Sequence, residues 1–238
     1  MKSWQKKIGP SSEADSTPPL AVFEERLPPE QRVLFQGLIS PPGIQAYLDS
    51  IPYVAEELDR SPLRVMLDGQ AHCLDGGIFA ALALRRLGFP ALILDLVPEP
   101  ETDDDHVLAL FRRQGLWGAV AKSNYVGLRY REPIYRSLRE LAMSYFEQFF
   151  NVERQKTLRA YTRPIDLAHF DRHGWMWSEE GTRRVARRLY SLKPIPLITP
   201  ESAAQLSLVD SRSFNAGTQG TDFGWIYRPE NTGQIAPP

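Results

Sequence analysis

A chain of 238 residues with 42% apolar and 24% charged residues has the balance of an ordinary globular protein, long enough for one sizeable domain with flanking segments. Its 28 Lys and Arg against 29 Asp and Glu give a formal charge of −1, which gives no reason to expect a nucleic acid or a membrane as partner. The single cysteine excludes a disulfide within the chain and a CxxC zinc site, so we expect no metal and no cofactor. With no signal-peptide pattern and no apolar run near 20 residues, the sequence predicts a cytoplasmic protein.

The two ends of the chain differ in composition from its middle. Residues 1–30 are rich in Pro, Ser and Glu, which predicts a disordered or loosely docked arm. From residue 200 to 238 the chain shifts to Ser, Gly, Asn, Thr and Pro, which predicts a poorly ordered tail. The domain itself is expected over residues 31–199.

The first predicted helices are marked by cap signals. The SPPG stretch at 40–43 begins a helix with apolar residues at helical spacing, which Pro52 interrupts. Ser61 and Pro62 offer a second N-cap and first-turn proline. These signals lead the chain to the segment that carries the cysteine.

A buried helix is predicted over residues 73–87. The sequence CLDGGIFAALALRRL is rich in helix formers after its two glycines, and Gly88 is a strong stop. Gly76 and Gly77 each cost about 1 kcal/mol of helix stability against alanine. Their presence predicts that another part of the backbone approaches the helix closely.

Three strands are predicted next, and two of them form a hairpin. The apolar run 91–98 reads as a strand, and an acidic turn-rich segment follows it. Residues 106–111 and 116–123 are expected to pair antiparallel about a turn at 112–115. The position opposite His106 then falls near residues 122–124.

Two further helices are predicted in the second half of the chain. Pro133 is expected to open an amphipathic helix, and another is expected to begin near Ser178 with acidic residues first and arginines later. The apolar positions of the first are Leu138, Leu141, Ala142, Tyr145, Phe146 and Phe149.

Cys73 is the candidate nucleophile. A thiol reacts as thiolate, and an unperturbed pKa of about 8.5 leaves it mostly protonated at neutral pH. At the first turn of a helix, free N–H groups and the positive end of the dipole favour an anion. A histidine on a neighbouring strand would complete the activation, and His106 is the candidate base.

A third residue would fix the tautomer of the imidazole. Asn124 is the first choice, with Ser123 or an acid from Asp103 to Asp105 as alternatives. Gln70 and the backbone N–H of Cys73 are candidate oxyanion donors. His72 is expected to be structural or to support the site without taking part in the chemistry.

With these residues in place, the sequence resembles the transglutaminase-like superfamily over about residues 60–130. The motifs are QAHCLDGGIFAALALRRLGFPALIL, DDDHVLALF and GLWGAVAKSN, in that order. The stretch from Lys122 to Asn151 also resembles a bacterial subgroup of unestablished activity. The resemblance implies a papain-like α+β fold, in which a cysteine-bearing helix packs on an antiparallel sheet.

The resemblance also implies the site: Cys73 as nucleophile, His106 as base, and an orienting residue at the end of the tryptophan strand. The family often has aspartate four residues after that tryptophan, whereas this chain has Ala121. The first hypothesis is therefore a cysteine enzyme that acts on a peptide, protein or small amide through a thioester acyl-enzyme, most simply a hydrolase. The rival hypothesis is a non-catalytic binding or scaffold domain whose triad has decayed, with Cys73 as an inert buried residue.

Overall fold

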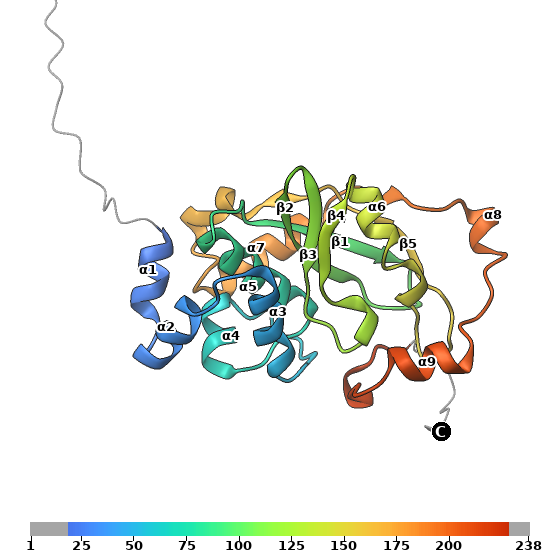
Figure 1. Cartoon of the computed structure of the whole chain (residues 1–238), viewed down its shortest axis with the longest axis horizontal. Helices are drawn as coiled ribbons and strands as arrows, with labels where there is room; N and C mark the ends of the chain where they lie inside the picture. Colours follow the sequence, from blue (N-terminus) through green and yellow to red (C-terminus); the bar gives the residue numbers. More distant parts are fainter. Residues whose placement is uncertain (1–18, 229–238) are drawn as a thin grey trace, which may run out of the picture.

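An antiparallel sheet forms the centre of the molecule in the computed structural model, which describes residues 19–228 (Figure 1). Its strand order is β4-β3-β2-β1-β5-β7, and β6 also pairs with β1. The strands are β1 (Leu92–Pro98), β2 (His106–Arg113), β3 (Leu116–Val120), β4 (Arg131–Tyr135), β5 (Leu158–Tyr161), β6 (Ile165–Asp166) and β7 (Ile195–Pro196).

Helices cover both faces of this sheet. On one side lie α1 (Pro19–Arg26), α2 (Pro29–Gln36), α3 (Pro41–Ser50), α4 (Pro62–Asp68), α5 (Cys73–Arg86) and α7 (Glu179–Tyr190). On the other side lie α6 (Leu138–Met143), α8 (Pro200–Ala203) and α9 (Ser211–Gly217). Short 3-10 turns are η1 (Val126–Leu128), η2 (Phe146–Gln148), η3 (Leu167–His173) and η4 (Phe223–Trp225). The predicted α+β class, with a cysteine-bearing helix packed on an antiparallel sheet, is confirmed.

Serine caps start the predicted helices where the sequence places them. The side chains of Ser40, Ser61 and Ser178 each accept the N–H three residues further on, at the starts of α3, α4 and α7. The hairpin is also confirmed, with Gln114 and Gly115 at positive φ between β2 and β3. Its register pairs Ala109 with Val120, and continuing that register for three residues sets Ser123 across from His106.

The helix predicted from Pro133 is wrong at its start. Pro133 lies within β4, where the pairing of Tyr135 with Trp117 on β3 holds the backbone extended. The helix α6 begins only after Ser137, which caps it, and it ends at Met143. The predicted apolar face is nevertheless buried, because its later residues continue inward through η2.

Both flanking segments contain ordered elements within the described residues. In the expected arm, Phe23 of α1 is fully buried, with its ring centroid 5.1 Å from that of Phe35 on α2. Phe35 in turn meets Phe79 of α5 at 6.1 Å, so this segment is part of the main core. In the expected tail, α8, α9 and η4 form behind the N-caps Thr199, Asp210 and Asp222. Residues 1–18 and 229–238 lie outside the described part.

Alternation along β2 divides its side chains between two cores. Val107, Ala109 and Phe111 join the core beneath α5, whereas Leu108 and Leu110 join the core on the α6 side. His106 has the same parity as Leu108. The strand therefore directs the His106 ring away from the helix that carries Cys73.

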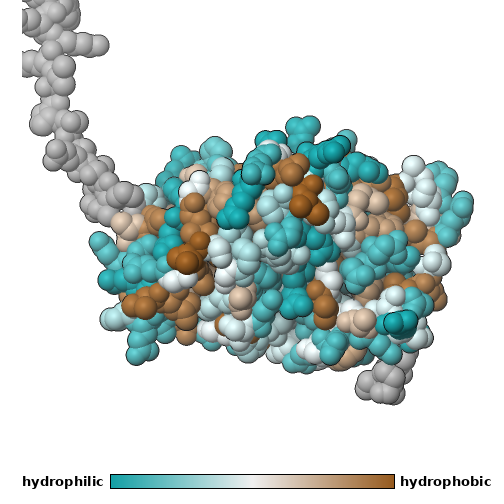
Figure 2. Space-filling view, in the orientation of Figure 1, coloured by the Kyte–Doolittle hydropathy of each residue, from teal (hydrophilic) through white to brown (hydrophobic). Residues whose placement is uncertain are grey.

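The surface mixes polar and apolar residues, with apolar patches at the end where α2 lies (Figure 2). Val33, Leu34 and Ile39 are the exposed large apolar residues of that region. Within residues 19–228, no helix combines the length and the apolar character that crossing a bilayer requires.

Candidate active site around Cys73

Cys73 is the first residue of α5, as the sequence predicts. Its thiol donates to the carbonyl oxygen of Asp105 at 3.6 Å, just before β2 begins. Only 9% of the residue is exposed. The sulfur thus lies against the start of the neighbouring strand and is almost completely buried.

The two glycines after Cys73 bring the helix onto the sheet. A Cβ atom added at Gly77 would lie 2.7 Å from Cγ1 of Val107 on β2. One added at Gly76 would overlap the side chain of Lys122, just past β3. The predicted close approach is therefore confirmed, and it fixes the distance between the start of α5 and the strands.

The surroundings of the thiol are acidic. Burial raises the pKa of Cys73 well above its ordinary value, and the carboxyls of Asp105, Asp104 and Asp95 raise it further. The backbone N–H of Val107 acts in the opposite direction. Desolvation and nearby negative charge outweigh the helix end here, so the thiol is held in its neutral form.

Two of these carboxyls form a buried pair. Asp95 is 3% exposed, and burial and the neighbouring Asp105 carboxyl raise its pKa well above the ordinary value. Asp95 Oδ1 and Asp105 Oδ2 each have no hydrogen-bond partner among the described residues. A proton shared between the two carboxyls would satisfy both oxygens.

His106 lies on the opposite face of the sheet. Its Nε2–H donates to the carbonyl oxygen of Leu128 at 2.6 Å, and its ring centroid lies 6.4 Å from those of Tyr145 and Phe149. Burial lowers the pKa of His106 to about 4, against the Leu128 carbonyl, which raises it. The imidazole and the thiol are thus not brought together, and the role of His106 as base stays a prediction.

Asn124 is engaged by the C-terminal segment instead of by His106. Its Nδ2 donates to the carbonyl oxygen of Asp222 at 2.8 Å, and its Oδ1 accepts the N–H of Asp222 at 3.0 Å. The alternatives have other partners too: Ser123 Oγ accepts the N–H of Tyr125, and Asp103 Oδ2 accepts the hydroxyl of Thr157. The orienting role of Asn124 likewise stays a prediction.

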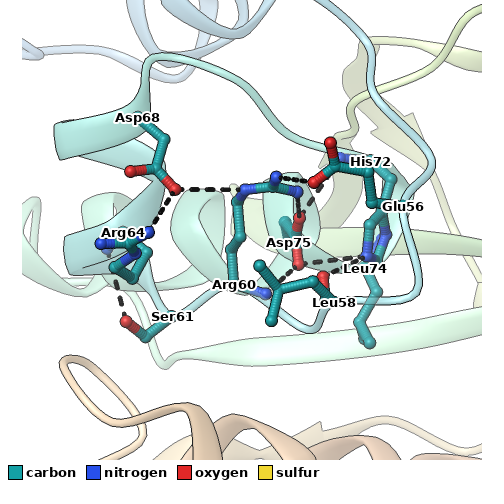
Figure 3. A network of polar contacts seen from close by, with 9 residues as sticks. All are labelled: Glu56, Leu58, Arg60, Ser61, Arg64, Asp68, His72, Leu74 and Asp75. Atoms are coloured by element: carbon teal, nitrogen blue, oxygen red, sulfur yellow. Dashed lines mark hydrogen bonds and ion pairs between the residues drawn. The ribbon is translucent and has the colours of Figure 1, made fainter.

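A polar network supports the start of α5 (Figure 3). His72 is the N-cap: its Nδ1 accepts the N–H of Leu74 at 3.2 Å, which requires a neutral ring. Asp75, fully buried, accepts the backbone N–H groups of Arg60 at 2.7 Å and of His72 at 3.4 Å. The structural role expected for His72 is confirmed.

Sequence reasoning missed Arg60, the centre of this network. Its guanidinium is 2% exposed and pairs with Glu56, Asp68 and Asp75. Glu56 stands four residues before Arg60, which is the one signal in the sequence. The other two partners become visible only when α4 and α5 pack together.

Lys122 was also missed. Its Nζ donates to the carbonyl oxygens of Leu48 at 2.7 Å and Ile51 at 2.5 Å, at the C-terminal end of α3. Burial lowers its pKa to about 8, while Asp49 opposes the change. A lysine directly after an apolar strand was the available signal.

A cavity of about 330 Å³ lies just past the C-terminal end of β3. It is bounded by the end of α3, by residues 122–126 and by residues 219–222 of the C-terminal segment. A smaller cavity of about 40 Å³ adjoins it beneath residues 225–227 and is lined by His106 and by Asp103, Asp104 and Asp105. Among residues 19–228, no group of three or more His, Cys, Asp and Glu side chains is arranged to hold a metal ion.

Comparisons with known proteins add little. No family model matches the sequence, and no curated protein matches it. Among solved structures, Legionella pneumophila LapG aligns with a TM-score of 0.33 and 13% identity, over 43% of this chain and 70% of that chain. Its EGTA-treated form aligns with the same TM-score and identity, over 44% and 68%. A likeness at this level carries no argument about activity.

Proposed function

We propose that this chain is a non-catalytic binding domain, in which a cysteine-bearing helix packs on the sheet without thiol catalysis. The observation that carries the proposal is the position of His106, whose ring faces the α6 side while Cys73 faces the start of β2 from the α5 side. Binding is assigned to the cavity region at the ends of β2 and β3, beside residues 122–126.

The electrostatics of the thiol support the same proposal. A catalytic cysteine needs a cationic or amide-rich setting that favours the thiolate. Cys73 is surrounded by carboxyls, and its pKa is raised by burial and by those charges. Rotation of the His106 side chain would not bring the imidazole to the thiol, because strand alternation places the Cβ atom of His106 on the opposite face of the sheet.

A cysteine hydrolase is the second candidate, favoured by the place of Cys73 in the first turn of α5 and by the order of its motifs. In that case the sulfur would attack an amide carbonyl of a peptide, a protein or a small amide, and the amine would leave from a thioester. Water would then release the acid, or an acceptor amine would form a new amide. This mechanism requires a base to reach the sulfur.

Alkylation of the thiol separates the two candidates. Because Cys73 is the only cysteine, iodoacetamide labelling followed by intact-mass measurement reports on it alone. Between pH 5 and pH 10 we expect the rate to stay below that of N-acetylcysteine at every pH and still to be rising at pH 10, without the plateau that a lowered pKa would give. His106→Gln, which keeps a donor for the Leu128 carbonyl, is expected to leave that profile unchanged. Rapid labelling below pH 7 that His106→Gln slows would overturn the proposal in favour of the hydrolase.

A further inference from the structure

The C-terminal segment 219–228 lies along the cavities at the ends of β2 and β3. The Asn124 carboxamide pairs with both backbone groups of Asp222, one as donor and one as acceptor. The hydroxyl of Thr221 adds a bond to the carbonyl oxygen of Asn124 at 2.8 Å. An amide that bonds both backbone groups of one residue recognises an extended peptide without regard to its side chain.

Side chains of the same segment close the smaller cavity. Trp225, Ile226 and Tyr227 line it from the tail side, and each is half-buried. Aromatic residues Tyr125, Phe149 and Phe150 line it from the body. This end of the groove therefore accepts aromatic groups.

An acidic loop, Asp103 to Asp105, also lines the smaller cavity. Burial raises the pKa of the Tyr125 hydroxyl well above its ordinary value, and the charges of Asp103 and Asp104 raise it further. The charge of Arg228 acts on the same hydroxyl in the opposite direction. These carboxyls line the smaller cavity, so a basic residue in a bound peptide would complement their charge there.

Residues 219–228 are attached by fewer packing contacts than the elements of the domain core. The helix α9 before it is anchored through Phe214, which joins a small cluster with Phe150 and Val209. Within residues 219–228, the described structure has only one 3-10 turn, η4. Segments with few buried apolar contacts open at low free-energy cost.

We infer that this groove is a binding site for an extended peptide that carries an aromatic residue followed by a basic one, and that residues 219–228 occupy it in cis. The partner peptide then competes with the tail for Asn124, for the aromatic lining and for the acidic loop. The inference rests on the proposed binding function and names both its ligand and its regulation.

Competition in cis sets the expected affinities. A tethered segment acts at an effective concentration in the millimolar range, so it suppresses binding of an identical free peptide. Weakening the tail alone should relieve that suppression. Asp222→Pro does so, because it removes the N–H that Asn124 accepts together with the side-chain cap on Gly224, while φ of −83° at this residue suits proline.

The test uses the full chain and a fluorescein-labelled peptide with the sequence of residues 219–228, followed by fluorescence anisotropy. We expect Asp222→Pro to bind the peptide at least tenfold more tightly than the wild type. The matched control Asp222→Asn retains both the N–H and a cap acceptor for Gly224, and it should behave as wild type. A labelled peptide with proline in place of Asp222 should bind every variant more weakly.

Hydrogen exchange keeps the test decisive if Asp222→Pro alters the fold. In the wild type, excess peptide should speed amide exchange in residues 219–228, and Thr221→Val should bind the peptide about two- to fivefold more tightly. Equal affinity of wild type, Asp222→Pro and Thr221→Val, or unchanged exchange in the tail, would overturn the inference. Iodoacetamide labelling is independent of these readouts, so failure of the inference and failure of the proposed function are distinguishable.

Discussion

At the scale of single residues, the chemistry of His106 depends on its parity within β2. Had β2 carried the histidine one position later, at residue 107, the ring would face α5 and the thiol. Instead Val107 occupies that place, tight against Gly77, and His106 lies among Tyr145 and Phe149. One step along the strand separates a possible dyad from a buried neutral imidazole.

The neutral state of His106 makes stability depend on pH. Its pKa in the folded chain is lowered to about 4 by burial, against about 6.5 in an unfolded chain. This contribution to stability is therefore fully present above pH 6.5 and is lost as pH falls through 4. The difference in unfolding free energy between wild type and His106→Gln should shrink by about 3 kcal/mol between pH 7 and pH 4.

Urea denaturation at a series of pH values measures this difference. Carboxyls also titrate in this pH range, because burial raises the pKa of Asp103 to about 7 and that of Asp104 to about 6. Both variants contain these carboxyls, so their contribution cancels in the difference. Those groups act in the opposite sense, since their stability is lost as pH rises. A pH-independent difference between the variants would contradict the neutral imidazole.

Lys122 gives a second prediction at this scale. Lys122→Met keeps the stem that packs beside α5 but leaves the carbonyl groups of Leu48 and Ile51 without their donor. The unfolding free energy should fall by about 1–3 kcal/mol, the cost of orphaned buried acceptors. Arg183→Met on the exposed side of α7 serves as control and should change it by less than about 0.5 kcal/mol. Equal effects of the two would argue against a capping role.

At the scale of elements, the start of α5 depends on the absence of side chains at Gly76 and Gly77. Gly76 and Gly77 weaken the helix locally, yet they allow its first turn to lie against β2 and β3. The cap formed by His72 and the Arg60–Asp75 network then compensates for the loss of intrinsic helix stability. Close packing, rather than helix propensity, governs this turn.

Gly76→Ala tests that balance. Alanine improves helix propensity by about 1 kcal/mol, but its methyl group would overlap the side chain of Lys122. We expect a net loss of about 1–3 kcal/mol in unfolding free energy, measured by chemical denaturation. Gly43→Ala in α3, whose added Cβ would meet only the hydroxyl of Ser40, should be close to neutral. A stabilised Gly76→Ala variant would refute the close contact.

Local signals explain which elements the sequence could predict. Ser40, Ser61 and Ser178 bond to their own helices, so their caps were visible in the sequence. The start at Pro133 could not be placed, because pairing of β4 with β3 is a contact between segments. The same holds for the site: Cys73 was found from its helix, whereas the face taken by His106 depends on which side of β2 packs against α5, and both sides of the strand are apolar.

At the scale of the whole molecule, the described chain has one large core and two smaller ones. The core beneath α5 also includes α1, α2 and α7, so the segment before residue 31 is built into the domain. The core on the α6 side lies across the sheet, and Tyr125 packs between it and the small cluster of Phe150, Val209 and Phe214. Segments attached to different cores should therefore differ in stability.

Phe35→Ala and Phe214→Ala compare the two kinds of attachment. Phe35 is fully buried between Phe23 and Phe79, so its truncation should lower the global unfolding free energy by about 3–5 kcal/mol. Phe214→Ala should leave the thermal midpoint nearly unchanged and instead speed hydrogen exchange in residues 211–228. If Phe214→Ala lowered the midpoint as much as Phe35→Ala, the C-terminal segment would belong to the main cooperative unit.

The shielding of the chain's lone sulfur has a practical consequence. Because Cys73 is nearly enclosed and held protonated, a maleimide dye added at neutral pH would react chiefly with a second cysteine introduced on the surface. Site-specific fluorophores or spin probes could thus be installed without first removing the native thiol. Their spectra would report on molecular motion in a chain that otherwise keeps its own sequence.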